Sequence, residues 1–438
     1  MTGRRWTLVV VLGLAGQLAW TVENMYLNVF VHETITDDPT VIAVLVAASA
    51  VTATLATLLV GAASDRVGRR RPFIAVGYVA WGLTTAGFGL VSADAVATWA
   101  PAGQAVAVAV VAVVVLDCLM SFLGAGANDA AYQAWVTDVT RPAERGRVEG
   151  VIAMLALVAM LLVFGGLDGL TQDGRWRVFF LVVGLTVAAV GVLAWFTVRD
   201  SPVLTRSPDG YLASVLHGLR PAAARANPAL YLALGMWAVA GIATQVYLPF
   251  LIVYLDKALR LDSYPLVLAV VLSGACVVSV LGGRLIDRFG KLRAVLPATG
   301  LYAVGLLAMY PARGPAGVIA AGLVTISAMM LVLAAVGSFV RDRTPPDRAG
   351  QVQGLRMVFA VLIPMVIGPF VGAAVIHGSG RTYTELGEVR QVPTPELFPV
   401  AALVLALMVP LHLAARRRAA LPVPGAGPVP TTTEEVGA

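Results

Sequence analysis

Residues Gly61–Pro72 read GAASDRVGRRRP, and residues Gly283–Lys291 repeat the same pattern as GRLIDRFGK. Each copy has a glycine, three residues, Asp-Arg, one residue, a second glycine and a cation. Equivalent positions are 222 residues apart, as for Asp65 and Asp287. Both copies lie between long apolar segments. A charged turn that recurs between hydrophobic segments predicts a membrane protein made of two related halves.

The composition also indicates a lipid environment. The chain has 438 residues, of which 58% are hydrophobic and 13% are charged, and its mean hydropathy is +0.83. Soluble domains are about 45–50% apolar and about a quarter charged, so a water-soluble core cannot hide this much apolar surface. The apolar run after Arg4 and Arg5 is too long for a signal-peptide core, and we interpret it as an uncleaved first span.

About 20 apolar residues cross a bilayer. This rule predicts an all-α membrane protein with twelve transmembrane helices in two pseudo-symmetric six-helix bundles. The predicted spans are 7–32, 40–62, 72–93, 105–136, 148–169, 176–198, 228–255, 264–284, 292–311, 315–340, 352–377 and 397–415. Eleven or thirteen spans remain an alternative, because the fourth segment is long and interrupted by glycines.

Four units follow from this division. They are an N-terminal bundle (1–198), a cytoplasmic linker with a short surface helix (199–227), a C-terminal bundle (228–418) and a disordered tail (419–438). With twelve spans, one side carries 24 of the 31 Lys and Arg residues. The other side carries the remaining seven: Arg175, Arg177, Lys257, Arg260, Arg313, Arg381 and Arg390. Because basic loops stay inside, we expect both termini and both charged turns to be cytoplasmic, in the cell membrane. The net charge of +6 then reflects topology and not nucleic-acid binding.

A second repeat follows the fourth and tenth spans. Asp138 and Asp342 are 204 residues apart, and four further pairs keep this spacing. These pairs are Thr140 with Thr344, Pro142 with Pro346, Gly146 with Gly350, and Gly150 with Gly354. Two repeats in nearly the same register support a duplicated architecture.

The two charged turns resemble the signature loops of the major facilitator superfamily, and the resemblance covers nearly the whole chain. It implies two six-helix bundles and a set of loop residues that lock the cytoplasmic side. That conformational motif is Gly61, Asp65, Arg66, Gly68, Arg69, Gly283, Asp287, Arg288, Gly290 and Lys291. Independently of the family, Gly68 and Gly290 give the turns backbone freedom. The Asp65 and Asp287 carboxylates are expected to meet a guanidinium or a helix N-terminus. The alternative is that the turns only set topology.

Charged groups inside a bilayer cost about 2.5–3.5 kcal/mol on insertion scales, so each one needs a reason. Glu23 lies inside the first span and borders a polar stripe. This stripe consists of Gln17, Trp20, Asn24 and Asn28. Asp117 begins a second stripe in the fourth span, with Ser121, Gly124 and Asn128. We predict substrate binding or proton carriage for both acids. The alternatives are a structural polar contact for Glu23 and close helix packing for Asp117.

The other polar groups differ between the two halves of the sequence. Asp129 is expected to partner loop arginines, and Asp168 is expected to be solvated at the outer edge. The seventh span has no acid but contains Gln245 and Tyr247, and Pro249 is expected to break or kink it. We therefore hypothesise that ion coupling lies on the first half and much of the substrate contact on the second.

These residues predict a secondary active transporter that works by alternating access, as a monomer. Its partners would be a small solute, such as a sugar or small organic molecule, the bilayer, and a proton as coupling ion. The alternative is a drug or metabolite efflux antiporter, although Met120 stands where that branch has an arginine. A membrane-embedded transferase is a remote alternative, because the adjacent acids Asp37 and Asp38 lack the partner acids that Mg²⁺ needs. A sensor derived from a transporter fold is another. The sequence has no ATP-binding loop, and its two cysteines and four histidines predict neither metal nor cofactor.

Overall fold

The computed structural model describes residues 3–101, 103–140, 145–200, 220–344, 355–385 and 388–418. Within these ranges the chain is mostly helical, and ten helices are long and apolar enough to cross a membrane. Two further helices, α8 (Arg145–Gly166) and α15 (Tyr264–Phe289), contain shorter apolar stretches. The chain is therefore a multi-pass membrane protein.

The long helices agree with the predicted spans to within a few residues. In the first half they are α1–η1–α2 (Gly3–Thr34, with the π-helical turn η1 at Val22–Tyr26), α3 (Pro39–Val67), α4–η2 (Arg71–Leu90), α6–η3–α7 (Ala105–Val139, with η3 at Ala125–Tyr132), α8 and α10 (Trp176–Thr197). In the second half they are α13–η5–α14–η6 (Pro228–Ala258), α15, α16 (Lys291–Met309), α17 (Gly314–Asp342), η8–α19 (Leu355–Ser379) and α20–α21 (Leu397–Arg418). Short helices α5 (Ala93–Ala97), α9 (Asp168–Gln172) and α12 (Pro221–Ala226) lie in connections.

Local sequence explains where these helices begin and break. At the start of α3, the Asp38 carboxylate accepts a hydrogen bond of 2.8 Å from the Thr40 amide, and Pro39 occupies the first turn. The same helix ends at Gly68, whose φ of 68° is left-handed and favours glycine. Pro249 replaces a turn of α-helix with the 3₁₀ turn η5 (Leu248–Phe250), which confirms the predicted break in the seventh span.

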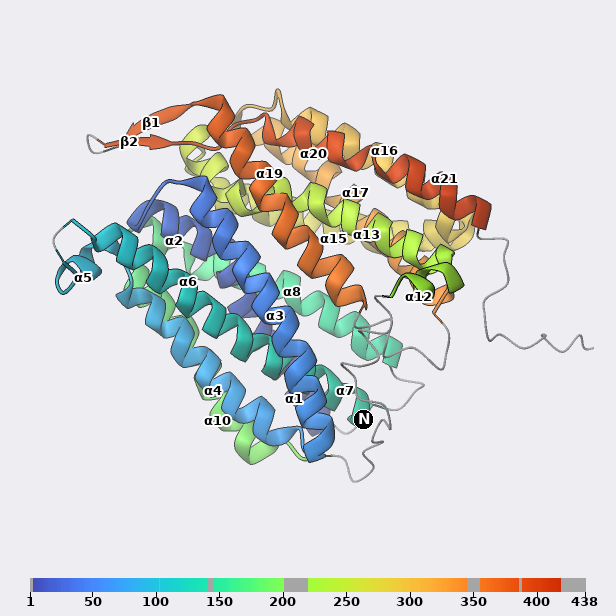
Figure 1. Cartoon of the computed structure of the whole chain (residues 1–438), viewed down its shortest axis with the longest axis horizontal. Coiled ribbons are helices and arrows are strands. Elements are labelled where there is room, and N and C mark those ends of the chain that lie inside the picture. The colour runs from blue at the N-terminus through green and yellow to red at the C-terminus, as the bar shows by residue number, and fades with distance from the viewer. Residues whose placement is uncertain are drawn as a thin grey trace, which may run out of the picture.

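The helices form two groups, one from each half of the chain (Figure 1). The groups meet where α3 packs against α19 and where α8 packs against α15. We call the end that carries Gly61–Pro72 the turn end. The opposite end carries a two-stranded antiparallel hairpin, β1 (Thr382–Glu385) and β2 (Glu388–Gln391), and we call it the hairpin end. The hairpin corrects the expectation of a purely helical chain, since its four-residue strands have no apolar pattern that would have predicted them.

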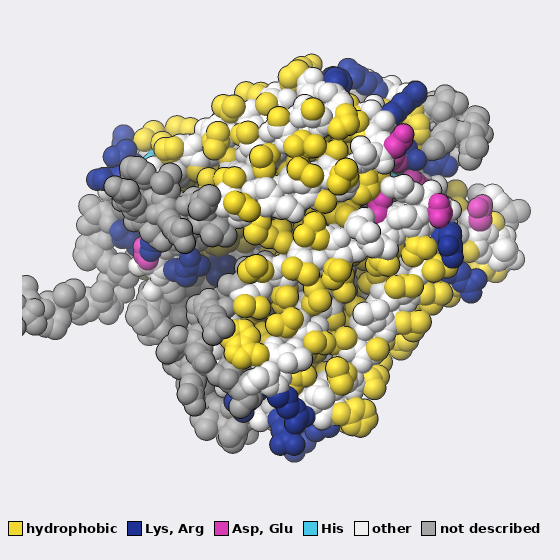
Figure 2. Space-filling view, turned by 180° about the vertical axis from the view of Figure 1, so that it is seen from behind, with side chains coloured by type: hydrophobic (Ala, Val, Ile, Leu, Met, Phe, Trp, Pro, Cys, Tyr) yellow, Lys and Arg dark blue, Asp and Glu magenta, His cyan; other side chains and the backbone are white. Residues whose placement is uncertain are grey.

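The outer surface of the helices suits lipid contact. Figure 2 shows a wide hydrophobic surface, with charged side chains gathered toward its edges. Large apolar side chains such as Phe196, Leu403 and Leu266 are exposed on the helices, as expected where hydrocarbon replaces water as solvent. The predicted linker helix falls largely within 201–219 and the predicted tail within 419–438, both outside the described residues.

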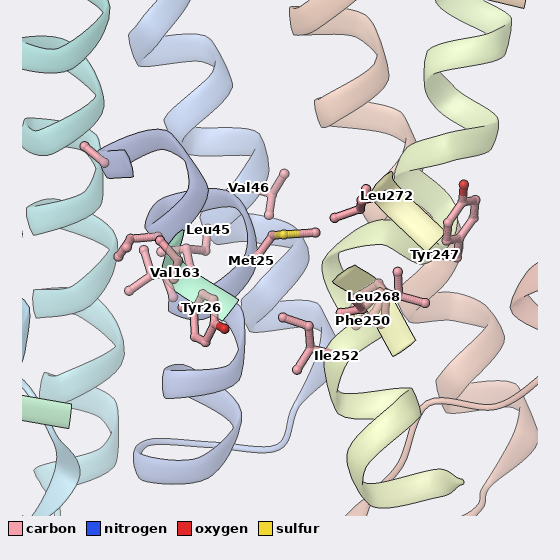
Figure 3. Close-up of a cluster of buried hydrophobic side chains, with 14 of the residues drawn as sticks. Met25, Tyr26, Leu45, Val46, Val163, Tyr247, Phe250, Ile252, Leu268 and Leu272 are labelled. Carbon is pink, nitrogen blue, oxygen red and sulfur yellow. The ribbon is translucent and has the colours of Figure 1, made fainter. Parts of the chain in front are cut away.

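Buried apolar side chains from both halves belong to one continuous hydrophobic cluster. In Figure 3, Met25 points from η1 toward the helices that carry Phe250 and Leu268, beside Val46 of α3. These residues are at most 8% exposed. The two halves are therefore sealed against each other by apolar packing at this level.

Glycines permit the close packing of α4 against α10. A Cβ atom at Gly184 would collide with the Gly82 carbonyl oxygen and the Ala86 amide. We predict that Gly184→Ala lowers the free energy of unfolding by about 1–3 kcal/mol, because the added methyl group forces two backbones apart. The measurement is the unfolding transition of the purified protein in detergent.

Gly165→Ala is the matched control, because a Cβ atom there would meet open space on α8. Alanine is the better helix former by about 0.5–1 kcal/mol, so this variant should be neutral or slightly more stable. Equal losses in the two variants would contradict the packing explanation.

Candidate functional site

Glu23 and Asp117, which we call the carboxylate pair, lie buried inside the first half. Glu23 is 6% exposed and Asp117 is 1% exposed. Ser121, one turn after Asp117 on α6 (Ala105–Gly124), donates a hydrogen bond of 2.7 Å to Glu23 Oε1. Asp117 is also close enough to Glu23 for a direct electrostatic interaction. The structure thus brings together the two acids that the sequence suggested separately.

Each member of the carboxylate pair keeps one oxygen without a protein partner. Glu23 Oε2 and Asp117 Oδ1 are both buried and have no hydrogen-bond partner in the described part of the chain. An unpartnered carboxylate oxygen in a dry site is costly. The arrangement can therefore lower its free energy by taking up a proton or another cation.

The backbone around Glu23 is irregular. Glu23 lies in the π-helical turn η1, where one extra residue per turn changes the direction of the side chains relative to α1. Such turns are rare and are often found at functional sites. A second π-helical segment, η3, carries Asn128 and Asp129. Neither turn was predicted, because apolar periodicity carries no signature of a single π turn.

Asn128 is the centre of a buried hydrogen-bond network. Its side-chain nitrogen donates to Asp129 Oδ1 at 2.7 Å, and its oxygen accepts from the Tyr78 hydroxyl at 2.8 Å. Trp20 lies within hydrogen-bonding reach of Asp129 and packs against Trp81, with ring centroids 5.2 Å apart. Asp129 therefore has neighbours inside the bundle, in addition to any contact with loop arginines.

The predicted residues of the second half form a separate cluster. Tyr247 is buried, and its hydroxyl lies 3.2 Å from the hydroxyl of Tyr302 on α16. The Thr244 hydroxyl lies 2.8 Å from the same Tyr302 oxygen. Gln245 is partly buried and faces Gly368 of α19. Thr244 and Tyr302 were missed, because no pattern in the sequence pairs helices that lie more than fifty residues apart.

The remaining residues of the first stripe make local contacts. Gln17, Trp20 and Asn24 are partly buried, and the Asn24 amide donates to the Trp20 carbonyl at 2.8 Å. Asn28 is buried and donates to the Asn24 carbonyl at 3.0 Å, while its own oxygen has no partner in the described residues. These two hydrogen bonds run along their own helix and do not involve Glu23 or Asp117.

At the turn end, Arg70 holds the first charged turn together. Its Nε lies 3.3 Å from Asp138 Oδ2, and Nη1 donates to the Ser64 hydroxyl. Asp200 Oδ1 accepts from the backbone amides of Arg70 and Arg71 at 2.7 and 2.9 Å. A carboxylate at this position satisfies free amides at the start of α4. Arg70, Asp138 and Asp200 were not predicted as motif residues.

The second charged turn makes a similar contact, although the 222-residue spacing pairs its cation with Arg69 and not with Arg70. Lys291 Nζ lies 2.6 Å from Asp342 Oδ1 at the end of α17. Asp138 and Asp342 are the aspartates of the second sequence repeat, so in each half the two repeats contact each other. Their burial differs: the side chains of Arg70 and Asp138 are 8% and 16% exposed, whereas those of Lys291 and Asp342 are 33% and 50% exposed.

The other motif residues are placed as follows. Arg66 and Arg69 are exposed, Gly61 is partly buried in α3, and Gly290 has a φ of 92°, a backbone conformation that suits glycine. The side chains of Asp65, Asp287 and Arg288, and the surroundings of Gly283, lie outside the described residues. The expected carboxylate contacts of Asp65 and Asp287 therefore stay predictions.

Asp168 differs from its expected state. It is 2% exposed and not solvated. Its Oδ1 accepts hydrogen bonds from the hydroxyls of Tyr26 at 2.7 Å and Tyr264 at 2.9 Å, and its Oδ2 accepts from the Gln172 amide at 2.6 Å. Tyr264 belongs to the other half of the chain. Asp168 therefore links the two halves at the hairpin end.

Comparison with known proteins identifies the fold. The family model described as Major Facilitator Superfamily matches residues 9–369. Among curated proteins, none matches the chain.

Several solved structures are similar. A bacterial homologue of the human lysosomal transporter Spinster, in an inward-facing and unoccupied conformation, has a TM-score of 0.68 at 17% identity and covers 95% of this chain and 98% of its own. The nucleoside transporter NupG has a TM-score of 0.69 at 12% identity, covering 96% and 100%. The xylose transporter XylE from E. coli has a TM-score of 0.68 at 14% identity, covering 98% and 100%. At these identities the likeness shows the fold alone.

The two charged turns provide a prediction about stability. Asp138→Ala should lower the free energy of unfolding by about 1.5–3 kcal/mol, because it removes an acceptor from the buried Arg70 guanidinium. Asp342→Ala, the pseudo-equivalent change, should cost less than about 1 kcal/mol, because the Lys291 pair is half in solvent. Unfolding in detergent, followed for both variants in parallel, measures the difference. Similar losses would show that burial does not set the strength of these pairs.

Proposed function

Because the chain belongs to the Major Facilitator Superfamily, we propose that it is a secondary active transporter that moves a small solute across the cytoplasmic membrane by alternating access. In this mechanism two rigid bundles rock around a site near the middle of the bilayer. We place the bundles at 1–198 and 228–418, with twelve spans in total. The helical lengths of α8 and α15, 22 and 26 residues, support counting them as spans.

The position of the basic residues supports cytoplasmic termini. The turn end carries both charged turns and the basic residues of α21 (Met408–Arg418), whereas the hairpin end carries far fewer cations. Because basic loops are retained on the cytoplasmic side, the turn end would face the cytoplasm. The protein would act as a monomer.

The carboxylate pair is the observation that carries the proposed coupling to an ion. Two buried carboxylates with one free oxygen each provide sites that a proton can occupy, and two negative charges that interact inside a membrane are costly. A proton is the simplest ion that neutralises the pair, because it needs no coordination shell. We propose that Glu23 and Asp117 carry it, and that Ser121 orients Glu23.

The solute would contact the second half as well as the first. Gln245, Tyr247 and the Tyr302–Thr244 hydroxyls offer hydrogen bonds, and Trp20 offers an aromatic face from the first half. Such groups suit a sugar or another small polar organic molecule. The solved structures of a nucleoside transporter and a xylose transporter with the same fold support this class of solute. A thermal-shift screen with pentoses, hexoses and nucleosides would identify a ligand.

Ion coupling gives a direct prediction. In proteoliposomes with an imposed pH gradient, Glu23→Gln should abolish the solute accumulation that the gradient drives, while exchange of solute down its own gradient persists. The amide keeps the size of the carboxyl group and a hydrogen-bond acceptor for Ser121, but it cannot bind and release the proton. A pH-sensitive dye inside the vesicles measures proton movement, and labelled solute measures transport and its direction.

Asp94→Asn is the matched control, because Asp94 is an exposed acid on the short connecting helix α5, whereas both acids of the carboxylate pair are buried. Its proton-driven accumulation should equal that of the unchanged protein. Proton dependence that survives Glu23→Gln would remove Glu23 from the coupling step. Outward solute movement against an inward proton gradient would instead indicate an efflux antiporter.

A further inference from the structure

The hairpin end contains a carboxylate that both halves share. Asp168 belongs to the first half, and two tyrosine hydroxyls donate to its Oδ1 atom. Tyr26, on η1, comes from the same half, whereas Tyr264, at the start of α15, comes from the other half. All three side chains are at most 4% exposed. A buried carboxylate with three donors is well satisfied, and a loss of any one donor leaves part of its charge uncompensated.

The Tyr26 ring holds its place through packing inside the first half. It contacts Phe179 and Phe164, with ring centroids 5.0 and 5.6 Å apart. The hydroxyl of Tyr26 can therefore stay on Asp168 when the halves move as rigid bodies. The hydroxyl of Tyr264 cannot stay there, because separation of the halves moves α15 away from α8 and α9.

Other contacts across the halves gather at the same end. Lys257 lies 3.3 Å from Glu33, and Arg390 donates to the backbone carbonyls of His32 and Glu33 at 3.1 and 3.0 Å. Thr40 lies 2.8 Å from His377 Nε2. Most of these contacts are partly exposed to solvent, where polar pairs contribute little. Among the polar contacts between the halves that are named here, the bond between Asp168 and Tyr264 has both side chains buried.

We infer that Asp168 is a positioning residue for transport: its carboxylate binds the Tyr264 hydroxyl and thereby holds the hairpin end closed. This inference rests on the proposed alternating access. Opening the hairpin end breaks the bond to Tyr264 and leaves the bond to Tyr26. The two tyrosines therefore form a matched pair, since each donates one hydroxyl to the same oxygen but only one hydroxyl crosses between the halves.

The test measures how often the hairpin end opens. Val46, 8% exposed between the halves, is changed to cysteine in the full chain after Cys118 and Cys276 are replaced by serine. The readout is its initial rate of labelling by a membrane-impermeant thiol reagent, which follows the open fraction even when that fraction is small. Asp262→Cys places a thiol at an exposed position of the hairpin end. The preparation in which this thiol is labelled, either intact cells or inverted vesicles, is the one whose hairpin end faces the reagent, and the test uses that preparation. This thiol also reports the rate at an ungated site.

Tyr264→Phe should raise the labelling rate of the Val46 cysteine about tenfold or more, as expected for the loss of a hydrogen bond to a charged acceptor. Tyr26→Phe should change this rate less than about twofold, because its bond is present in both the open and the closed state. The rate at the Asp262 cysteine should stay constant in all variants. Asp168→Asn should raise the rate as well, and Tyr264→Phe should add little in the Asp168→Asn background.

An unchanged rate in Tyr264→Phe would overturn the inference, and so would an equal rise in Tyr26→Phe. These outcomes are separable from a failure of the proposed function. If proton-driven transport is absent but Tyr264→Phe alone speeds labelling, the contact still closes the hairpin end. If transport is present and labelling is unaffected, only the role of Asp168 is wrong.

Discussion

Lipid is a solvent that offers no hydrogen bonds, and this constraint decides where the charged groups of the chain can lie. Most of them gather toward the edges of the hydrophobic surface (Figure 2). Two of the acids that remain inside are held by donors from other helices: Ser121 donates to Glu23, and Tyr264 donates to Asp168. A transporter needs polar groups in its interior. Each hydrogen bond from one helix to an internal acid on another also fixes how those two helices lie against each other. Structure and mechanism therefore depend on the same few contacts.

The duplicated turns show how one local design occurs in two halves with different burial. In both halves a cation at the start of a helix meets an aspartate near the end of the next long span along the chain, as Arg70 meets Asp138 and Lys291 meets Asp342. In the first half the contact is buried and is reinforced by Asp200 at the start of α4. In the second half it is half in solvent, where screening weakens it. The first half thus holds its turn more rigidly, and it also contains the carboxylate pair.

Hydropathy and charge placement predicted the helices well, because crossing a bilayer requires about 20 apolar residues whatever the fold. Local chemistry also predicted the break at Pro249 and a need for backbone freedom at Gly68, which has a left-handed φ of 68°. The partners of the internal acids could not be predicted in this way. Asp168 was expected in solvent, yet its two tyrosine donors lie 142 and 96 residues away in the sequence. Only the packing of distant helices turns an edge residue into a buried one, and a single sequence does not encode that packing in any local pattern.

One short element contains one acid of the carboxylate pair and contacts Asp168. The π-helical turn η1, Val22–Tyr26, contains both Glu23, which faces Ser121, and Tyr26, which binds Asp168. A π turn is a local departure from the α-helix that is rare and often found at functional sites. Glu23 and Tyr26 are three residues apart on this backbone, so the direction of one side chain constrains that of the other. The Glu23 carboxylate and the Tyr26 hydroxyl that binds Asp168 are thus linked by covalent geometry, which a substitution at either residue perturbs.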